Sequence, residues 1–305
     1  DNIEHIQNIF RECDKEFKKR YLQQDDVFQT DPLSIISLQK LIYPFKLRRH
    51  KADVLHDLPE KVEDIKYCYL NEIQLQLYKE TLKLKGTPIF DSLKESNSPF
   101  PYIHIFSLIT TLKQICNDPG LVHPKFERYG SNKLLLLDQL IQECLENDQK
   151  IVIFSQYAKM VNIISKRLTH QGIEHVTLTG MSVKRGDIVR NFQENKEIKV
   201  FVGSLLAGGT GIDLTSANIV IHFDRWWNSA KEEQATDRIY RIGQTKNVQV
   251  YKIVTKGTLE ERIDQIISRK KYIFDKYVNQ DEQVLKNLTR EELLDVLKEP
   301  EELNF

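Results

Sequence analysis

Two arginines, Arg238 and Arg241, stand three residues apart in the stretch QATDRIYRIGQ that begins at Gln234. Positions i, i+4 and i+7 share one side of a helix. Gln234, Arg238 and Arg241 are therefore predicted to form one stripe on a short helix ending at Gly243. The neighbouring stripe is apolar and would anchor the helix: Ala235, Ile239 and Ile242. Guanidinium groups held rigidly in this way suit a phosphate ligand. The alternative is a solvated helix face on which Asp237 is the partner of the arginines.

A glycine-rich loop follows the β-rich run IKVFVGS and reads LLAGGTGIDLT. Its glycines, Gly208, Gly209 and Gly211, would let backbone N–H groups approach an anion closely. A tight turn between a strand and a helix is the alternative. The loop is not a phosphate loop of the G-x-x-x-x-G-K-S/T type, and no Gly-Lys dipeptide occurs in the chain, so the main triphosphate cradle is missing.

The only two tryptophans, Trp226 and Trp227, lie side by side in DRWWN, directly after the β-rich run NIVIHF. Adjacent side chains point in different directions, so one ring is predicted to be exposed, where it can stack against nucleic acid. The alternative is that one ring packs under the sheet and the other covers a helix.

The elements that must position these groups begin near Lys150, where short β-rich runs alternate with helical segments. This alternation predicts an α/β fold whose parallel sheet, at residues 148–256, has helices on both faces. Ligands of such sheets gather at the carboxyl ends of the strands, where the segments above are placed. We expect a helical linker at 1–60 and a mainly helical insertion at 61–147. Residues 257–305 are expected to form a long helix and an acidic helical tail that begins with capping-box spacing.

Composition limits the kinds of site that the chain can contain. Its 305 residues include 44 Lys and Arg against 44 Asp and Glu, so nucleic-acid binding must come from local patches rather than from overall charge. Four scattered cysteines without a C-x-x-C pair argue against a zinc site or a disulfide framework, and we assign no metal site. No run of about 18 apolar residues and no apolar leader occurs, which argues against membrane insertion and secretion.

Together these segments resemble the second motor lobe of SWI/SNF-family DNA translocases, which are related to helicases. Residues 204–215 resemble the family's motif V, residues 224–228 its tryptophan segment and residues 234–244 its motif VI. Earlier segments follow in the family's order: PFKLRRHKADVLHDLPEK from Pro44, LKQICNDPGLV from Leu112, KIVIFSQY as motif IV, and LTG with Arg185 as motif IVa. The WWN segment followed by DR-x-x-RIGQ is highly specific.

The resemblance implies a RecA-like lobe that works together with a first RecA-like lobe. ATP is expected to bind in the cleft between the two lobes, and double-stranded DNA is expected to bind across both. Arg238 and Arg241 then match the arginine fingers, which neutralise charge on the transferred phosphoryl group. Nucleotide contacts are implied for Gly211, Asp213 and Gln234. Contacts to DNA are implied for Ser155, Gln156, Thr179, Gly180, Ser204, Gly208, Gly209, Trp226 and Trp227.

The family's first lobe carries the motifs that hold Mg²⁺ and the β- and γ-phosphates, and this sequence contains neither a phosphate-loop lysine nor D-E-x-H. We therefore expect a half-motor that does not hydrolyse ATP appreciably without the first lobe. Its expected partners are double-stranded DNA and that lobe, with no membrane partner, and we expect a monomer. Two positions depart from the family, where Asn is usual at Asp213 and a basic residue at Leu206.

A non-catalytic module that binds DNA or a protein is the alternative function. Joining a first lobe would separate the two, because only the motor would regain DNA-stimulated hydrolysis. A third interpretation, an RNA helicase of the DEAD-box class, has no use for the WWN segment. The expected compartment is the cytoplasm, beside the nucleoid, in a prokaryote and the nucleus in a eukaryote.

Overall fold

The computed structural model describes residues 58–94, 101–204, 212–226, 229–266, 268 and 288–300. The chain divides into two compact units, Asp1–Asp57 and Leu58–Phe305, and the described residues all belong to the second. The helical linker predicted for residues 1–60 therefore lies almost wholly outside the described part.

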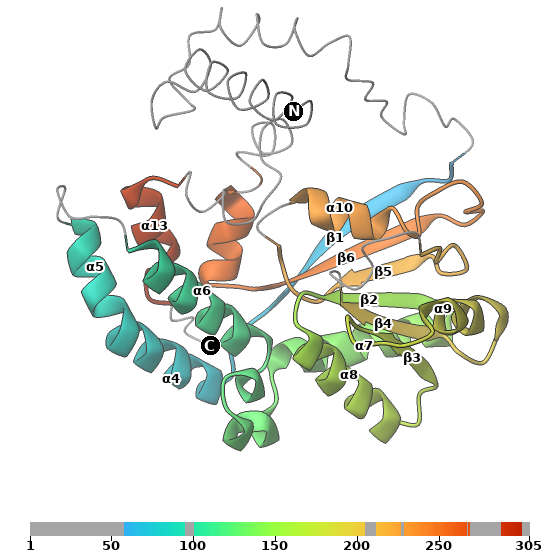
Figure 1. Ribbon diagram of the computed structural model, residues 1–305, viewed down its shortest axis with the longest axis horizontal. Coiled ribbons are helices and arrows are strands. Elements are labelled where there is room, and N and C mark those ends of the chain that lie inside the picture. Colours follow the sequence, from blue (N-terminus) through green and yellow to red (C-terminus); the bar gives the residue numbers. More distant parts are fainter. Residues whose placement is uncertain are drawn as a thin grey trace, which may run out of the picture. The chain divides into compact units, whose positions relative to one another are not determined.

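A six-stranded parallel sheet forms the centre of the second unit (Figure 1). Its strands, in order across the sheet, are β1 (Lys61–Cys68), β6 (Val248–Thr255), β5 (Ile219–His222), β2 (Ile151–Ser155), β4 (Val200–Ser204) and β3 (His175–Leu178). All neighbouring strands run parallel, so their carboxyl ends meet at one edge. Ile153 of the central β2 lies opposite Val202 of β4 and Ile221 of β5.

Strand β1 is an element that the expectation of a mainly helical segment at residues 61–147 did not include. It pairs with β6 along its whole length, from Lys61 opposite Val248 to Cys68 opposite Thr255. The strand lies at the edge of the sheet and many of its side chains reach solvent, so charged residues replace the apolar pattern by which a strand is identified. The sheet thus extends beyond the predicted range of 148–256.

Helices cover both faces of the sheet, as predicted. They are α7 (Asn132–Glu146), reached through the short η4 (Pro119–Leu121) and η5 (Pro124–Tyr129), then α8 (Ala158–His170), α9 (Arg185–Glu194) and α10 (Ser229–Thr236). Successive strand side chains point to opposite faces. Ile153 accordingly packs in the core under α7 and α8, whereas Phe154 packs in the core under α9 and α10. Both faces of β2 are buried, which explains its continuous apolar sequence.

A group of helices beside the sheet, called the helical subdomain below, has a core of its own (Figure 1). Its elements are α4 (Glu72–Thr81), η3 (Leu82–Gly86), α5 (Thr87–Lys94), α6 (Tyr102–Asn117), the helix at residues 259–266 and α13 (Arg290–Val296). Tyr78 and Leu112 share this core with Ile263 and Val296, so C-terminal helices pack against the insertion. The predicted capping box is present at the start of α13. None of the described helices is both long and apolar enough to cross a membrane.

Strands β1 and β6 are joined by charged side chains as well as by the pairing of their backbones. The carboxylate of Glu63 accepts hydrogen bonds from Lys61 Nζ at 2.8 Å and from Lys252 Nζ at 2.6 Å. Burial alone would raise the pKa of Glu63, but hydrogen bonds to both lysines and attraction by their charges outweigh this and lower the pKa to about 2. Glu63 therefore stays ionised in the folded chain over a pH range in which the unfolded chain binds a proton.

We expect Glu63→Gln to reduce the free energy of unfolding by about 1 kcal/mol at neutral pH, a modest value because the group is partly solvated. The stabilisation is complete above the ordinary pKa of 4.5 and is lost as the pH falls toward 2, so the difference between the two chains shrinks over that range. Urea denaturation at neutral and at acidic pH measures this. Glu174→Gln, at an exposed site, is the control. A difference that does not change with pH would contradict the electrostatic account.

Candidate functional site

Several predicted site residues lie along the carboxyl edge of the sheet. Ser155 ends β2 and Ser204 ends β4, and the two residues are paired in the register. Strand β5 pairs with the other side of β2, so the segment that follows β5 runs next to Gln156. Thr179 and Gly180 follow β3, on the far side of β4. The parallel sheet thus gathers segments that are far apart in the sequence.

The carboxylate of Asp224, just beyond β5, fixes the segment beyond β2. It accepts hydrogen bonds from Ser155 Oγ at 2.5 Å, from the backbone N–H of Gln156 at 3.0 Å and from Asn117 Nδ2 at 3.3 Å. Burial raises the pKa of Asp224, while the charge of Lys113 and the hydrogen bonds from Ser155 and Gln156 act in the opposite direction. A buried carboxylate bonded in this way holds both segments in one geometry.

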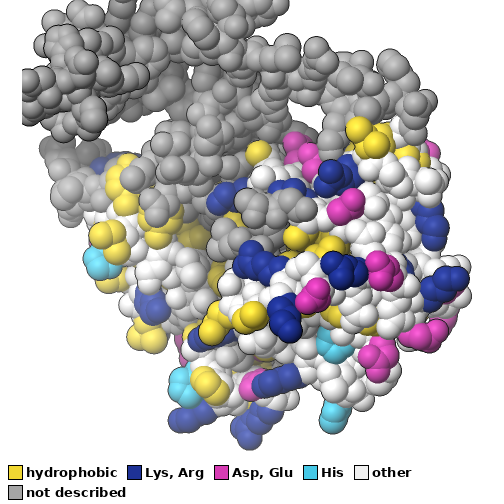
Figure 2. Space-filling model, turned by 45° about the vertical axis from the view of Figure 1, so that its right-hand side comes forward, with side chains coloured by type: hydrophobic (Ala, Val, Ile, Leu, Met, Phe, Trp, Pro, Cys, Tyr) yellow, Lys and Arg dark blue, Asp and Glu magenta, His cyan; other side chains and the backbone are white. Residues whose placement is uncertain are grey.

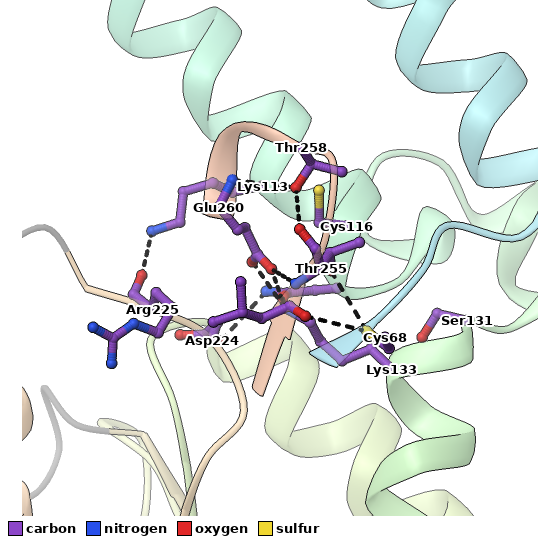
Figure 3. Close-up of polar contacts among 12 residues, drawn as sticks. Cys68, Lys113, Cys116, Ser131, Lys133, Asp224, Arg225, Thr255, Thr258 and Glu260 are labelled. Carbon is purple, nitrogen blue, oxygen red and sulfur yellow. Dashed lines mark hydrogen bonds and ion pairs between the residues drawn. The ribbon is translucent and has the colours of Figure 1, made fainter. Parts of the chain in front are cut away.

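The guanidinium group of Arg225 links the same segment to two helices. Its terminal nitrogens donate to Glu232 Oε2 of α10 at 2.7 Å and to Asp264 Oδ1 of the helix at 259–266 at 2.5 Å. Glu232 also accepts a hydrogen bond from the backbone N–H of Trp226 at 2.8 Å. From α6, Lys113 Nζ donates to the carbonyl oxygen of Arg225 at 2.6 Å (Figure 3). Three helices therefore hold the segment 224–226.

A buried ion pair joins α7 to the helix at 259–266 next to this segment (Figure 3). Lys133 Nζ donates to both carboxylate oxygens of Glu260, at 2.8 and 2.6 Å, and to Asn117 Oδ1 at 3.0 Å. Glu260 also accepts from the backbone N–H of Thr255 at 2.9 Å. Burial alone would lower the pKa of Lys133, but attraction to Glu260 and hydrogen bonding with it raise the pKa instead. Lys133 is therefore held in its charged form, with hydrogen bonds to Glu260 and to Asn117.

Two of the residues predicted to contact DNA are buried in the structure. Ser155 is fully buried. Its hydroxyl donates to Asp224 and accepts from the backbone N–H of Tyr157 at 3.1 Å. Trp226 is only 4% exposed, and the ammonium group of Lys231 lies 4.9 Å from the centre of its ring. Both side chains are therefore enclosed by other residues of the unit, and their contacts to DNA stay predictions. Several other predicted residues lie outside the described part: Gly208, Gly209, Gly211 and Trp227.

Three predicted DNA-contacting residues keep accessible surface at this edge: Gln156, Thr179 and Gly180. The loop after β3 is held by Ser182, whose Oγ accepts from the backbone N–H of Thr179 at 2.9 Å. It is also held by Arg185, whose guanidinium group donates to the carbonyls of Thr179 and Gly180 at 3.4 Å. Ser204, by contrast, is buried. Among the described residues, fewer of the predicted DNA-contacting side chains are therefore accessible at this edge than the sequence predicts.

Arg238 and Arg241 lie beyond the end of α10, so the predicted single helical stripe is wrong. The helix ends at Thr236, and turns carry the chain on to Gly243, whose φ is +101°. The carbonyl of Arg238 accepts from the backbone N–H of Leu214 at 3.0 Å, a bond to another segment in place of one within a continuing helix.

The apolar stripe is confirmed only in part. Ala235 and Ile239 are buried under the sheet as predicted, whereas Ile242 is 74% exposed because the helix has already ended.

Gln244 holds the arginine segment against the loop after β4, a role that the sequence does not reveal. Its Nε2 donates to the carbonyls of Ala217 at 2.8 Å, Thr215 at 3.2 Å and Ile239 at 3.3 Å. Its Oε1 accepts from the N–H groups of the next two residues. The only sequence signal is a glutamine after a turn glycine. The buried amide thus positions the backbone that carries both arginines.

Arg238 and Arg241 are half-buried residues, and among the described residues neither guanidinium group makes a hydrogen bond or an ion pair. Arg225 differs, because two carboxylates neutralise it. The pair is therefore suited to an external anion. Asp213 uses Oδ1 to accept from the N–H of Thr215 at 3.1 Å, and Gln234 is exposed on α10. No group of three or more His, Cys, Asp or Glu in the described ranges is arranged to hold a metal ion.

Comparisons with known proteins agree with this architecture. The family profile of the helicase conserved C-terminal domain matches residues 132–243, and that of the SNF2-related domain matches residues 6–121. The solved C-terminal domain of the SWI2/SNF2 ATPase of Sulfolobus solfataricus is 34% identical, with a TM-score of 0.64 over 79% of this chain and 99% of that one. This chain belongs to the SWI2/SNF2 family. The resemblance and the RecA-like fold inferred from the sequence are thereby confirmed.

Two further relatives are longer than this chain. The SWI2/SNF2 ATPase core of Sulfolobus solfataricus in complex with dsDNA is 36% identical, with a TM-score of 0.67 over 92% of this chain and 59% of that one. The putative ATP-dependent helicase/translocase YwqA of Bacillus subtilis is 38% identical over 287 residues, which are 91% of this chain and 30% of that protein. The chain spans 26% to 30% of the length of its curated bacterial relatives.

We expect Lys133→Met to lower the free energy of unfolding by about 3–5 kcal/mol, because the carboxylate of Glu260 is left buried without its cation. Adding Glu260→Met removes the stranded charge and should recover part of the loss. Urea denaturation of both variants measures this. Lys166→Met, which breaks an exposed ion pair with Glu127, is the control and should cost less than about 1 kcal/mol. Equal costs for Lys133→Met and the control would contradict the buried pair's role.

Proposed function

We propose that this chain is the C-terminal half of an ATP-dependent translocase of double-stranded DNA that remodels nucleoprotein complexes. In this proposal it supplies arginine fingers and contacts to the DNA backbone, and it hydrolyses ATP only together with a first RecA-like lobe. The observation that carries the proposal is the pair of half-buried arginines, Arg238 and Arg241, on a segment that Gln244 holds beside the loop after β4.

The donors of this pair suit the terminal phosphate of ATP. Each guanidinium group presents N–H donors in a fixed fork and has no acidic partner among the described residues. Charge that develops on the transferred phosphoryl group would be neutralised by both, an effect worth roughly 10³ to 10⁵ in rate in related enzymes. Mg²⁺ and the remaining phosphates would be held by the first lobe. Further nucleotide contacts are proposed for Gly211, Asp213 and Gln234.

The DNA-binding part of the proposal rests on Gln156, Thr179 and Gly180 at the carboxyl edge, together with Trp227 and the glycines of the loop after β4. On the face seen in Figure 2, Lys and Arg are interspersed with Asp and Glu rather than gathered in one block. Binding should therefore come from local contacts to the backbone, which makes it largely independent of sequence and weaker at high salt. The solved relative in complex with dsDNA supports this assignment.

The test is ATP turnover by the chain alone and after a first lobe of the same family is added or joined before Asp1. We expect no appreciable turnover alone and turnover stimulated by duplex DNA, not by RNA, once the lobe is present. Arg241→Ala should then lower kcat by about 10³ or more, because a finger acts on charge in the transition state. Arg190→Ala, on the exposed surface of α9, is the control and should leave kcat unchanged.

Turnover by the chain alone that Arg241→Ala abolishes would contradict the half-motor. Silence with and without the lobe, with salt-sensitive DNA binding intact, would favour the alternative of a non-catalytic binding module.

A further inference from the structure

The segment 224–226 follows β5 of the sheet, but several of its hydrogen-bond partners lie on other elements. Lys113 stands on α6 of the helical subdomain and is 2% exposed. Its ammonium group reaches across to the carbonyl oxygen of Arg225 at 2.6 Å, where Gln156 Nε2 also donates at 3.3 Å. One carbonyl oxygen thus joins the helical subdomain, the segment beyond β5 and the segment beyond β2.

The charge of Lys113 acts on the same segment through a second route. It favours the ionised form of Asp224, against the effect of burial. The carboxylate of Asp224 accepts from Ser155 Oγ and from the backbone N–H of Gln156, while the Gln156 side chain is directed by its own bond to the carbonyl of Arg225 at 3.3 Å. A neutral residue in place of Lys113 would remove both effects while leaving the apolar stem of the side chain in its place.

We propose that Lys113 is a positioning residue that sets the geometry of segment 224–226 and of Gln156, and so couples the helical subdomain to the DNA-contacting edge. The inference rests on the proposed DNA binding for its functional consequence. Its structural part is independent, since it concerns only the position of a segment that contains Trp226. A displacement of α6 would then change the affinity for DNA without any contact between α6 and the duplex.

Trp226 provides a direct readout of this segment. In a Trp227→Phe background it is the only tryptophan, and its ring is 4% exposed. Lys113→Met should raise the acrylamide quenching constant of Trp226 by about twofold or more, because the segment opens locally. Lys113→Arg, which keeps a charged donor, should stay close to the parent. Lys166→Met on α8 is the control for loss of a lysine and should not change quenching.

Affinity for duplex DNA is measured on the same substitutions with Trp227 restored. Lys113→Met should raise Kd by about tenfold, the loss expected for a charge-assisted hydrogen bond that no longer holds the contacting residue, and Lys113→Arg should restore most of it. If Lys113→Met does not fold, Asp224→Asn keeps the shape of the side chain and removes the charge that Lys113 faces, and it should raise quenching in the same way.

Quenching that is unchanged in Lys113→Met, or in Asp224→Asn if the first variant does not fold, would overturn the inference. So would increased quenching without any loss of DNA affinity in a chain whose parent binds DNA. A parent chain that does not bind duplex DNA would instead overturn the proposed function, and the quenching result would still decide whether Lys113 positions the segment.

Discussion

The geometry of the candidate site depends on a set of buried charges where the helical subdomain meets the sheet. Lys113, Lys133 and Arg225 lie within hydrogen-bond reach of carboxylates or carbonyls that have almost no contact with water. A charge in such surroundings is costly unless it is paired and fully hydrogen-bonded, so each group tolerates only a narrow range of positions. The segments beyond β2 and β5 are bonded to these groups through Asp224 and the backbone of residues 224–226, so their positions are limited in the same way.

The contrast between the arginines follows from the same constraint. Arg225 is neutralised by Glu232 and Asp264 and acts as a structural tie. Arg238 and Arg241 have no such partners among the described residues, and the charge on their side chains is available to a ligand. The backbone that carries them is held by a neutral amide, Gln244, so it is positioned without the loss of their charge. Fixed backbone with free charge is what stabilisation of a developing negative charge requires.

The sequence predicts the sheet, the helices on both faces and the capping box of α13, because these depend on local periodicity and cap chemistry. It misses β1, since an edge strand rich in charge has no apolar pattern, and it extends α10 too far, since a bond from Leu214 to Arg238 ends the helical pattern. The sequence does not tell which of the two adjacent tryptophans is buried, and it misses the buried charges. Their partners are separated by 112 positions for Lys113 and Arg225 and by 69 for Ser155 and Asp224, which no local pattern encodes.

The central claim is that Arg238 and Arg241 complete a nucleotide site whose other half lies on a first RecA-like lobe. The most direct measurement is the calorimetric affinity of this chain for an isolated first lobe, with ADP and with ADP plus aluminium fluoride, which imitates the phosphoryl group in transfer. The account predicts that aluminium fluoride tightens the association strongly for the parent chain and hardly at all for Arg241→Ala, because the fingers bind the transition state more tightly than the product. Equal tightening in both chains would contradict it.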